Sequence, residues 1–227
     1  MGLSQSKVSK RVPGQYHLNL FTEGEYKGLP VYTHPDGLVL DYLERLHQVI
    51  HLTAEKYSKV FAVRVDLHLP HYYSPIEQES LSNNYLHIFI KGLRYRLQRY
   101  SDEKQSLGIR VHDAGFKYAW AREYGPDSGK PHFHLLLLFN GHAFNRLGNF
   151  SCGENLYSRI GESWAEALRI QLTEGVKFTH FPEDGQYRVH TKRQEYLTDV
   201  FYRASYLTKV ATKNFHDGLH AFGVSRF

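Results

Sequence analysis

The chain has 227 residues, which is enough for one substantial domain with its own apolar core. It contains a single cysteine, Cys152, so a disulfide framework and a cysteine-based zinc finger are excluded. A formal net charge of +5 favours a polyanion as partner. No apolar run approaches the roughly 20 residues of a membrane helix, and we expect a soluble protein of a reducing cytoplasm with no membrane partner.

The first part of the chain is expected to contain an arm, a helix and a strand. Residues 1–30 are expected to form an extended arm ahead of a single domain over residues 31–227. Apolar residues recur with helical periodicity from Leu38 to Tyr57. A strand is expected from Val60 to Pro70, because apolar and polar residues alternate there. The polar face of this strand carries Arg64, Asp66 and His68.

The middle of the chain is expected to form a second helix and a hairpin. The helix is expected over residues 79–100, with a basic outer face that either solvent or DNA could contact. Residues 116–123 and the strongly apolar run 135–139 are expected to be strands, and the Gly, Pro, Asp and Ser residues between them are turn formers. A third helix over residues 155–170 and a short strand over residues 186–191 are expected to follow.

Two histidines, His132 and His134, lie at the start of the second hairpin strand. Side chains two residues apart on a strand share a face, so the two imidazoles project together, roughly 6 to 7 Å apart, and can share a metal ion. The hairpin brings Glu123 near them. Imidazole and carboxylate suit Mn²⁺ or Mg²⁺, and nothing in the sequence excludes zinc. In the alternative interpretation, the histidines are only polar residues at a strand start.

Residues 196–213 have the periodicity of a helix whose apolar stripe packs on a core. The opposite side carries, at steps of four, three and four residues, Tyr202, Tyr206, Lys209 and Lys213. Tyrosines interleaved with lysines on a polar face suit the handling of phosphate groups. A phenol is a poor nucleophile at neutral pH because its pKa is about 10. Attack on a phosphodiester would therefore need a metal and a cation, and Lys209 lies one helical turn from Tyr206.

These residues resemble the HUH endonucleases, which are named for a His-hydrophobic-His strand. The resemblance is strongest to the inovirus-type rolling-circle replication initiators of phages and prophages. His132-Phe133-His134 looks like the metal motif, and Tyr206-Leu207-Thr208-Lys209 looks like the Tyr-x-x-Lys nucleophile motif. Tyr202 ahead of Tyr206 resembles the two-tyrosine arrangement of the phage-type initiators. The similarity covers residues 60–227.

Strands separated by helices, with an antiparallel hairpin at the centre, predict an α+β fold with helices laid against a sheet. The resemblance implies the same fold, an RRM-like antiparallel HUH palm. It also implies a metal-dependent endonuclease that nicks DNA, transfers the strand through a 5′-phosphotyrosine link and so initiates rolling-circle replication. Tyr206 would attack the phosphodiester, Lys209 would steady the developing charge, and Tyr202 would serve a second transfer.

The resemblance also implies the ligands and partners. Glu123 would join His132 and His134 in holding Mg²⁺ or Mn²⁺, because family members often carry a carboxylate or amide on the strand preceding the histidine pair. Residues 60–70 correspond to the family's first motif but depart from its usual hydroxyl-rich pattern. The residues expected at the periphery of the active site are Asp66 and His68, and those expected to contact DNA are Lys213 and Arg203.

The expected partner is single-stranded or supercoiled origin DNA in the cytoplasm of a bacterial host cell. No Walker-type segment is present, so a host helicase would unwind the DNA, and a host polymerase would extend the freed end. Mobilisation relaxases and single-strand transposases use the same chemistry, although relaxases usually place the nucleophile before the histidines. Two alternatives lie outside this class: a non-catalytic DNA-binding regulator on the same scaffold, and a chance combination of the two motifs.

Overall fold

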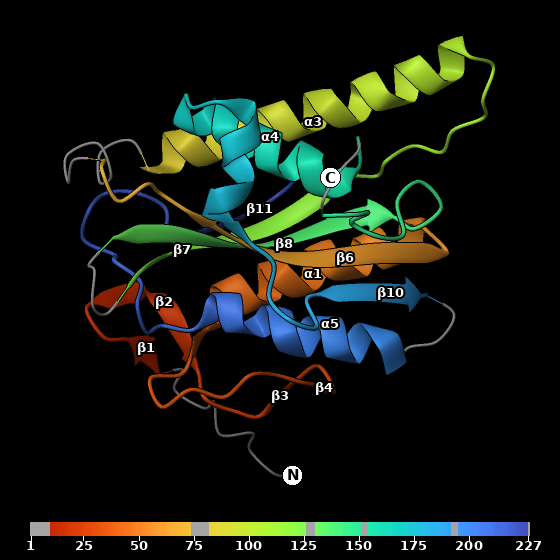
Figure 1. Ribbon diagram of the computed structural model, residues 1–227. Coiled ribbons are helices and arrows are strands. Elements are labelled where there is room, and N and C mark those ends of the chain that lie inside the picture. Colours follow the sequence, from red (N-terminus) through yellow and green to blue (C-terminus); the bar gives the residue numbers. More distant parts are fainter. Residues whose placement is uncertain (1–9, 74–81, 126–129, 151–153, 192–194, 227) are drawn as a thin grey trace.

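The computed structural model describes residues 10–73, 82–125, 130–150, 154–191 and 195–226. Its centre is an antiparallel sheet in the order β10-β6-β8-β7-β11, with β9 paired to β6 (Figure 1). The strands are β6 (Lys59–His68), β7 (Lys117–Tyr124), β8 (Pro131–Asn140), β9 (Thr179–His180), β10 (Gln186–His190) and β11 (Phe222–Val224). The α+β class and the central antiparallel sheet predicted from the sequence are confirmed.

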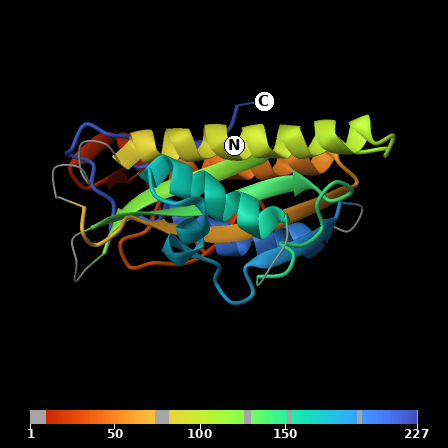
Figure 2. The same cartoon turned by 45° about the horizontal axis from the view of Figure 1, so that its top comes forward.

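Helices cover both faces of this sheet, as Figures 1 and 2 show from two directions. They are α1 (Leu40–Lys56), α3 (Ser82–Ser106), α4 (Leu156–Leu168) and α5 (Glu195–Ser205). One face packs against α3 and α4, and the other against α1 and α5. The run 135–139 of β8 is therefore buried on both sides, as its apolar sequence predicts. Among the described residues, no helix has the length and apolar character that a membrane span requires.

The segment before α1 forms short strands that pack beside it. They are β1 (Arg11–Val12), β2 (Gln15–Phe21), β3 (Glu25–Tyr26), β4 (Leu29–Pro30) and β5 (Leu38–Val39). β1, β2 and β5 form a small sheet, and β3 pairs with β4. Over its described part, the expected arm is thus extended but paired, and it buries Val12 and Leu18. The division between residues 1–30 and 31–227 stays a prediction, and residues 1–9 lie outside the described part.

Three of the helices agree in type and place with the sequence. α4 begins after Asn155, whose side chain accepts a hydrogen bond from the backbone of Ser158 in a capping box. α3 continues past the predicted end at Tyr100, because pairs four residues apart, such as Arg99 with Glu103, support its exposed last turns. Between α4 and β9 lies one further helical segment of the 3-10 type, η1 (Leu172–Phe178).

The last helix is shorter than the sequence predicts. α5 ends at Ser205, and one 3-10 turn, η2 (Tyr206–Thr208), follows before the backbone becomes extended at Lys209. The prediction of one helix over residues 196–213 was therefore wrong. The hydroxyls of Ser205 and Thr208 donate to backbone carbonyls three residues earlier, which favours a tighter turn. Beyond the turn, Val210 donates its backbone N–H to Gly37 beside β5.

Candidate metal centre and tyrosine site

Strand pairing brings the predicted metal ligands to one end of the sheet. The register of β6, β8 and β7 places His132 opposite His68 on one side and Glu123 on the other. Two residues further along β8, His134 lies opposite Asp66. Because alternate residues of a strand share a face, these five side chains all point to the face that α1 and α5 cover.

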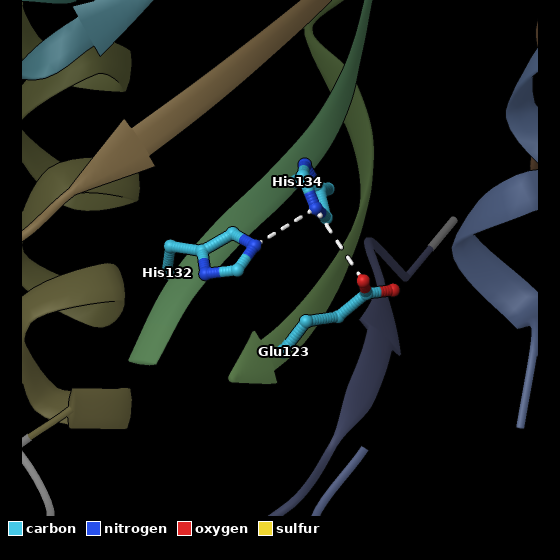
Figure 3. Close-up of side chains that lie close together, drawn as sticks. All are labelled: Glu123, His132 and His134. Atoms are coloured by element: carbon cyan, nitrogen blue, oxygen red, sulfur yellow. Dashed lines mark hydrogen bonds and ion pairs between the residues drawn. The ribbon is translucent and has the colours of Figure 1, made fainter. Parts of the chain in front are cut away.

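Glu123, His132 and His134 form a compact group of possible metal ligands (Figure 3). The Nε2 atoms of the two histidines are 3.1 Å apart, and Nε2 of His134 is 3.4 Å from Oε2 of Glu123. One ligand atom from each residue lies within 4.8 Å of the others. Glu123 and His134 are buried and His132 is half-buried. This group could hold one divalent ion, and the nitrogen and oxygen donors are compatible with several metals.

Asp66 orients His134 from the side away from Glu123. Its Oδ1 lies 2.6 Å from Nδ1 of His134, accepts a hydrogen bond from Nε of Arg64 and forms an ion pair with the same guanidinium. Burial raises the pKa of Asp66, but the hydrogen bond from His134 and the charge of Arg64 outweigh burial and lower it to about 2. The ionised carboxylate favours the tautomer of His134 with a proton on Nδ1, which leaves the lone pair of Nε2 directed at the group. This carboxylate–histidine arrangement is typical of metal sites, so Asp66 is a positioning residue.

His132 stays uncharged near neutral pH. Burial, together with the neighbouring His134 and His68, lowers its pKa to about 4. The ring of His68 stacks on that of His132 with centroids 5.6 Å apart. A neutral imidazole keeps the lone pair that a metal requires. His68 thus lies beside the group and contacts the possible ligand His132.

Glu123 is held by two buried lysines. Its Oε2 accepts hydrogen bonds from Lys209 at 2.5 Å and from Thr212 at 2.8 Å, and its Oε1 lies 3.1 Å from Nζ of Lys213. Burial raises the pKa of Glu123, but the contact with the imidazole of His134 and the charges of Lys213 and Lys209 outweigh burial and hold it well below its usual range. The carboxylate is therefore ionised and fixed in place before any metal binds.

Lys213 does not occupy the position that the sequence predicted for it. Its side chain is buried against Glu123, and burial lowers its pKa to about 8. Because the chain leaves the helix at Ser205, Lys213 turns inward and pairs with Glu123 instead of presenting its charge to DNA. Arg203, on the last turn of α5, is exposed, and its predicted DNA contact stays a prediction.

Tyr206 lies directly beside this group. Its ring packs edge-to-face on His134, with centroids 5.8 Å apart, and on Tyr32, at 5.1 Å. Nζ of Lys209 is 3.6 Å from the centre of the Tyr206 ring, and the guanidinium of Arg64 is 5.4 Å from it. The structure therefore brings together the predicted nucleophile, the predicted cation and the predicted metal ligands, although η2 replaces the expected helix.

Tyr202 lies one turn earlier, on α5, and is 42% exposed. It lines the same cavity as Tyr206 and His134. The neighbours of this site that sequence reasoning missed include Arg64, Tyr32 and Thr212. The sequence contains a usable signal for Arg64, because this residue precedes Asp66 by two positions and so lies on the same polar face of the strand. It contains none for Tyr32, because the contact that places this residue, a backbone N–H donated to Oγ of Ser205, joins distant parts of the chain.

We expect the wild-type chain to bind one Mn²⁺ per molecule and His134→Ala to abolish this binding. Asp66→Asn should weaken it by about 10- to 100-fold, because the orienting carboxylate is lost while all three ligands remain. Isothermal titration calorimetry measures both effects. His190→Ala is the matched control, because this exposed histidine pairs with Lys59 at the other end of β6. Equal Mn²⁺ affinity in the wild type and His134→Ala would contradict the assignment.

Comparisons with known proteins match most of the chain. A family model described as the YagK/YfjJ C-terminal domain matches residues 21–225, which include all the residues of the site. The uncharacterized protein YagK of Escherichia coli (strain K12) is 30% identical over 195 residues, covering 83% of this chain and 93% of YagK. The uncharacterized protein YfjJ of the same strain is 31% identical over 201 residues, covering 82% of this chain and 93% of YfjJ.

Among solved structures, the N-terminal nuclease domain of the minute virus of mice non-structural protein-1 aligns with 80% of this chain and 78% of that chain. The aligned residues are 11% identical, and the TM-score is 0.22. A TM-score this low does not bear on the function of this chain.

Proposed function

For this chain, which belongs to the YagK/YfjJ C-terminal domain family, we propose the function of a metal-dependent endonuclease that nicks single-stranded DNA and transfers the cut strand. The observation that carries the proposal is the contact of Tyr206 with both His134 and Lys209. His134 lies far from Tyr206 and Lys209 in the sequence, and the fold packs His134 and Lys209 against the same carboxylate, that of Glu123.

Packing alone is a poor explanation for this group. Two imidazoles that face each other through nitrogen atoms, and a buried carboxylate with two buried lysines, contribute less to stability than apolar side chains of similar size. Clusters of buried titratable groups with shifted pKa values are typical of functional sites. The position of a tyrosine against such a cluster favours phosphoryl transfer over a purely structural role.

The proposed reaction exchanges one phosphodiester for another. Oη of Tyr206 forms a bond to the phosphorus, and the bond from phosphorus to the 3′ oxygen of the preceding nucleotide breaks. The phenol gives up its proton to solvent, and the departing oxygen takes up one, so that a 5′-phosphotyrosine and a free 3′-hydroxyl result. Because bonds of the same kind form and break, the step needs no oxidant or energy-rich cofactor and can run backwards to rejoin the strand.

The surrounding side chains would support this step electrostatically. A divalent ion held by Glu123, His132 and His134 would polarise the scissile phosphate, and Mg²⁺ or Mn²⁺ suits these donors. Lys209, buried between Glu123 and the ring of Tyr206, would steady negative charge as it develops on the phenol oxygen and the phosphate. A preorganised cation in a buried site stabilises such charge more strongly than one in water does.

The finer role that we propose is initiation of rolling-circle replication. It is supported by the resemblance of the two motifs to HUH initiators and by the position of Tyr202, which lines one cavity with Tyr206. A covalently occupied Tyr206 cannot attack again, so Tyr202 would cut and rejoin the regenerated origin. Origin DNA, a host helicase and a host polymerase are the partners that this role requires.

The test is to incubate the protein with labelled single-stranded DNA fragments that cover the genomic region around its gene, with Mn²⁺ or with EDTA. We expect a protein–DNA adduct that survives denaturation, forms with Mn²⁺ and not with EDTA, and maps to Tyr206 or Tyr202 by mass spectrometry. Tight binding without an adduct on any fragment would refute the endonuclease.

One observation favours a second candidate function, a non-catalytic DNA-binding regulator. Lys209, Lys213 and Thr212 already satisfy the carboxylate of Glu123, so this carboxylate has partners without a metal. The same assay separates the two functions, because a regulator binds DNA equally well in EDTA and forms no adduct with Mn²⁺.

A further inference from the structure

A cavity of about 360 Å³ opens beside Tyr206 and His134, and the proposed chemistry leaves it unused. This volume lies within the range of small-ligand pockets, roughly 300 to 1,000 Å³. The cavity lies between α5, β10 and the turn at residues 182–185. Three further tyrosines line it, namely Tyr32, Tyr187 and Tyr202.

We infer that this cavity binds the base of the unpaired nucleotide next to the phosphate that Tyr206 attacks, and that Tyr187 supplies a stacking face for it. The inference rests on the proposed function and adds the part of the substrate that the site recognises. It concerns one unpaired base, because a base that is paired and stacked in a duplex cannot turn into a cavity beside its own phosphate.

The position of the cavity supports this assignment. Tyr206 and His134 form part of its wall, so a phosphate held between them lies at the edge of the cavity. A base is joined to its phosphate through a single sugar, which places the adjacent base inside the cavity rather than on a distant surface. Proteins usually bind single strands by stacking successive bases on aromatic side chains.

Tyr187 is suited to stacking by its place on β10. It lies opposite Ala62 in the strand register, and the small alanine leaves room for the ring against the sheet. The ring is half-buried: it packs on the core between the sheet and α5, and it also lines the cavity. A ring anchored in this way loses little side-chain freedom when a base packs on it.

The cavity has cations on one side, which favour a phosphate, and carboxylates on another, which favour a neutral base. Arg64 is fixed by its ion pair with Asp66 and lies beside Tyr206, and Arg203 is exposed on α5. Both cations suit the phosphates that flank a base. The turn at residues 182–185 instead presents exposed carboxylates, which would repel a phosphate, and the backbone of Gly185 ties it to Arg64.

The inference is tested by a double-mutant cycle that compares DNA affinities with and without the Tyr187 ring, and with and without the bases of the DNA. Binding is measured by fluorescence anisotropy in EDTA, where the proposed cleavage does not occur, with a 12-nucleotide oligothymidylate and a 12-mer of abasic residues as probes. We expect Tyr187→Leu to weaken binding of the oligothymidylate about tenfold and to leave binding of the abasic probe unchanged. Tyr187→Phe keeps the ring and should bind both probes as the wild type does.

Tyr95→Leu is the matched control, because this tyrosine is 61% exposed on α3, on the other face of the sheet. It should change binding of neither probe. If Tyr187→Leu weakens both probes equally, or neither, the inference is overturned. A second measurement uses the unaltered chain: an oligonucleotide carrying 5-iodouracil should crosslink under ultraviolet light to a tyrosine of the cavity, and crosslinks found only elsewhere would overturn the inference as well.

The two proposals fail in different ways. Coupling between Tyr187 and the bases without any covalent adduct would leave the base pocket standing and refute the endonuclease. Adduct formation without this coupling would support the endonuclease and refute the base pocket. A wild-type chain that binds neither probe would refute the base pocket, whatever the adduct assay shows.

Discussion

Tyr206→Phe is expected to abolish formation of the covalent DNA adduct while leaving DNA affinity nearly unchanged. The substitution removes only the hydroxyl group, so the ring keeps its contacts with His134, Tyr32 and Lys209. Loss of a nucleophile should lower the rate by at least about 10³-fold. Adduct yield on denaturing gels and affinity by fluorescence anisotropy, measured with the same Mn²⁺-containing buffer, separate chemistry from binding.

Tyr202→Phe and Tyr95→Phe complete this experiment. Tyr202→Phe should still form the first adduct but should fail to release a rejoined circle, because the second nucleophile is lost. Tyr95→Phe, on the exposed face of α3, should behave as the wild type in both assays. Undiminished adduct formation by Tyr206→Phe would refute the assignment of the nucleophile.

Glu123→Gln is expected to lower the free energy of unfolding by about 3 to 5 kcal/mol, because it leaves two buried ammonium groups without a carboxylate partner. Urea denaturation in EDTA measures this loss without any contribution from a bound metal. Adding Lys213→Met to Glu123→Gln should recover part of the stability, because one of the two unpaired buried charges is then removed.

Glu174→Gln is the matched control for Glu123→Gln. Glu174 pairs with Lys177 at 2.8 Å in η1, and both side chains are exposed, so its loss should change stability by less than about 1 kcal/mol. If Glu123→Gln destabilised the protein no more than Glu174→Gln does, the carboxylate would not be the electrostatic centre of this site.

The hairpin and its group of possible metal ligands could be predicted because they depend on local rules. The alternation of side chains on a strand places His132 and His134 on one face, and the turn formers after Glu123 predict that the preceding strand pairs with this one, as β7 and β8 do. The apolar run 135–139 likewise predicts a strand that is covered on both faces. These patterns need no information from elsewhere in the chain.

The role of Asp66 depended on the register between distant strands. Alternation on β6 predicts which face Asp66 occupies, but any of several registers would satisfy that pattern. In the register that the structure adopts, Asp66 lies opposite His134 and within hydrogen-bonding distance of Nδ1. This contact changes its assignment from a residue at the periphery to one that orients a possible metal ligand.

By itself, the sequence determined the fold class and the histidine pair with its neighbouring carboxylate, because periodicity and turn chemistry act over a few residues. Only the tertiary structure decided where the last helix ends and what Lys213 contacts. Helical periodicity continues through that segment. However, the backbone hydrogen bond from Val210 to Gly37 and the ion pair of Lys213 with Glu123 hold residues 210–213 in a non-helical path. Such long-range contacts outweigh local helix propensity, whose contribution per residue is small.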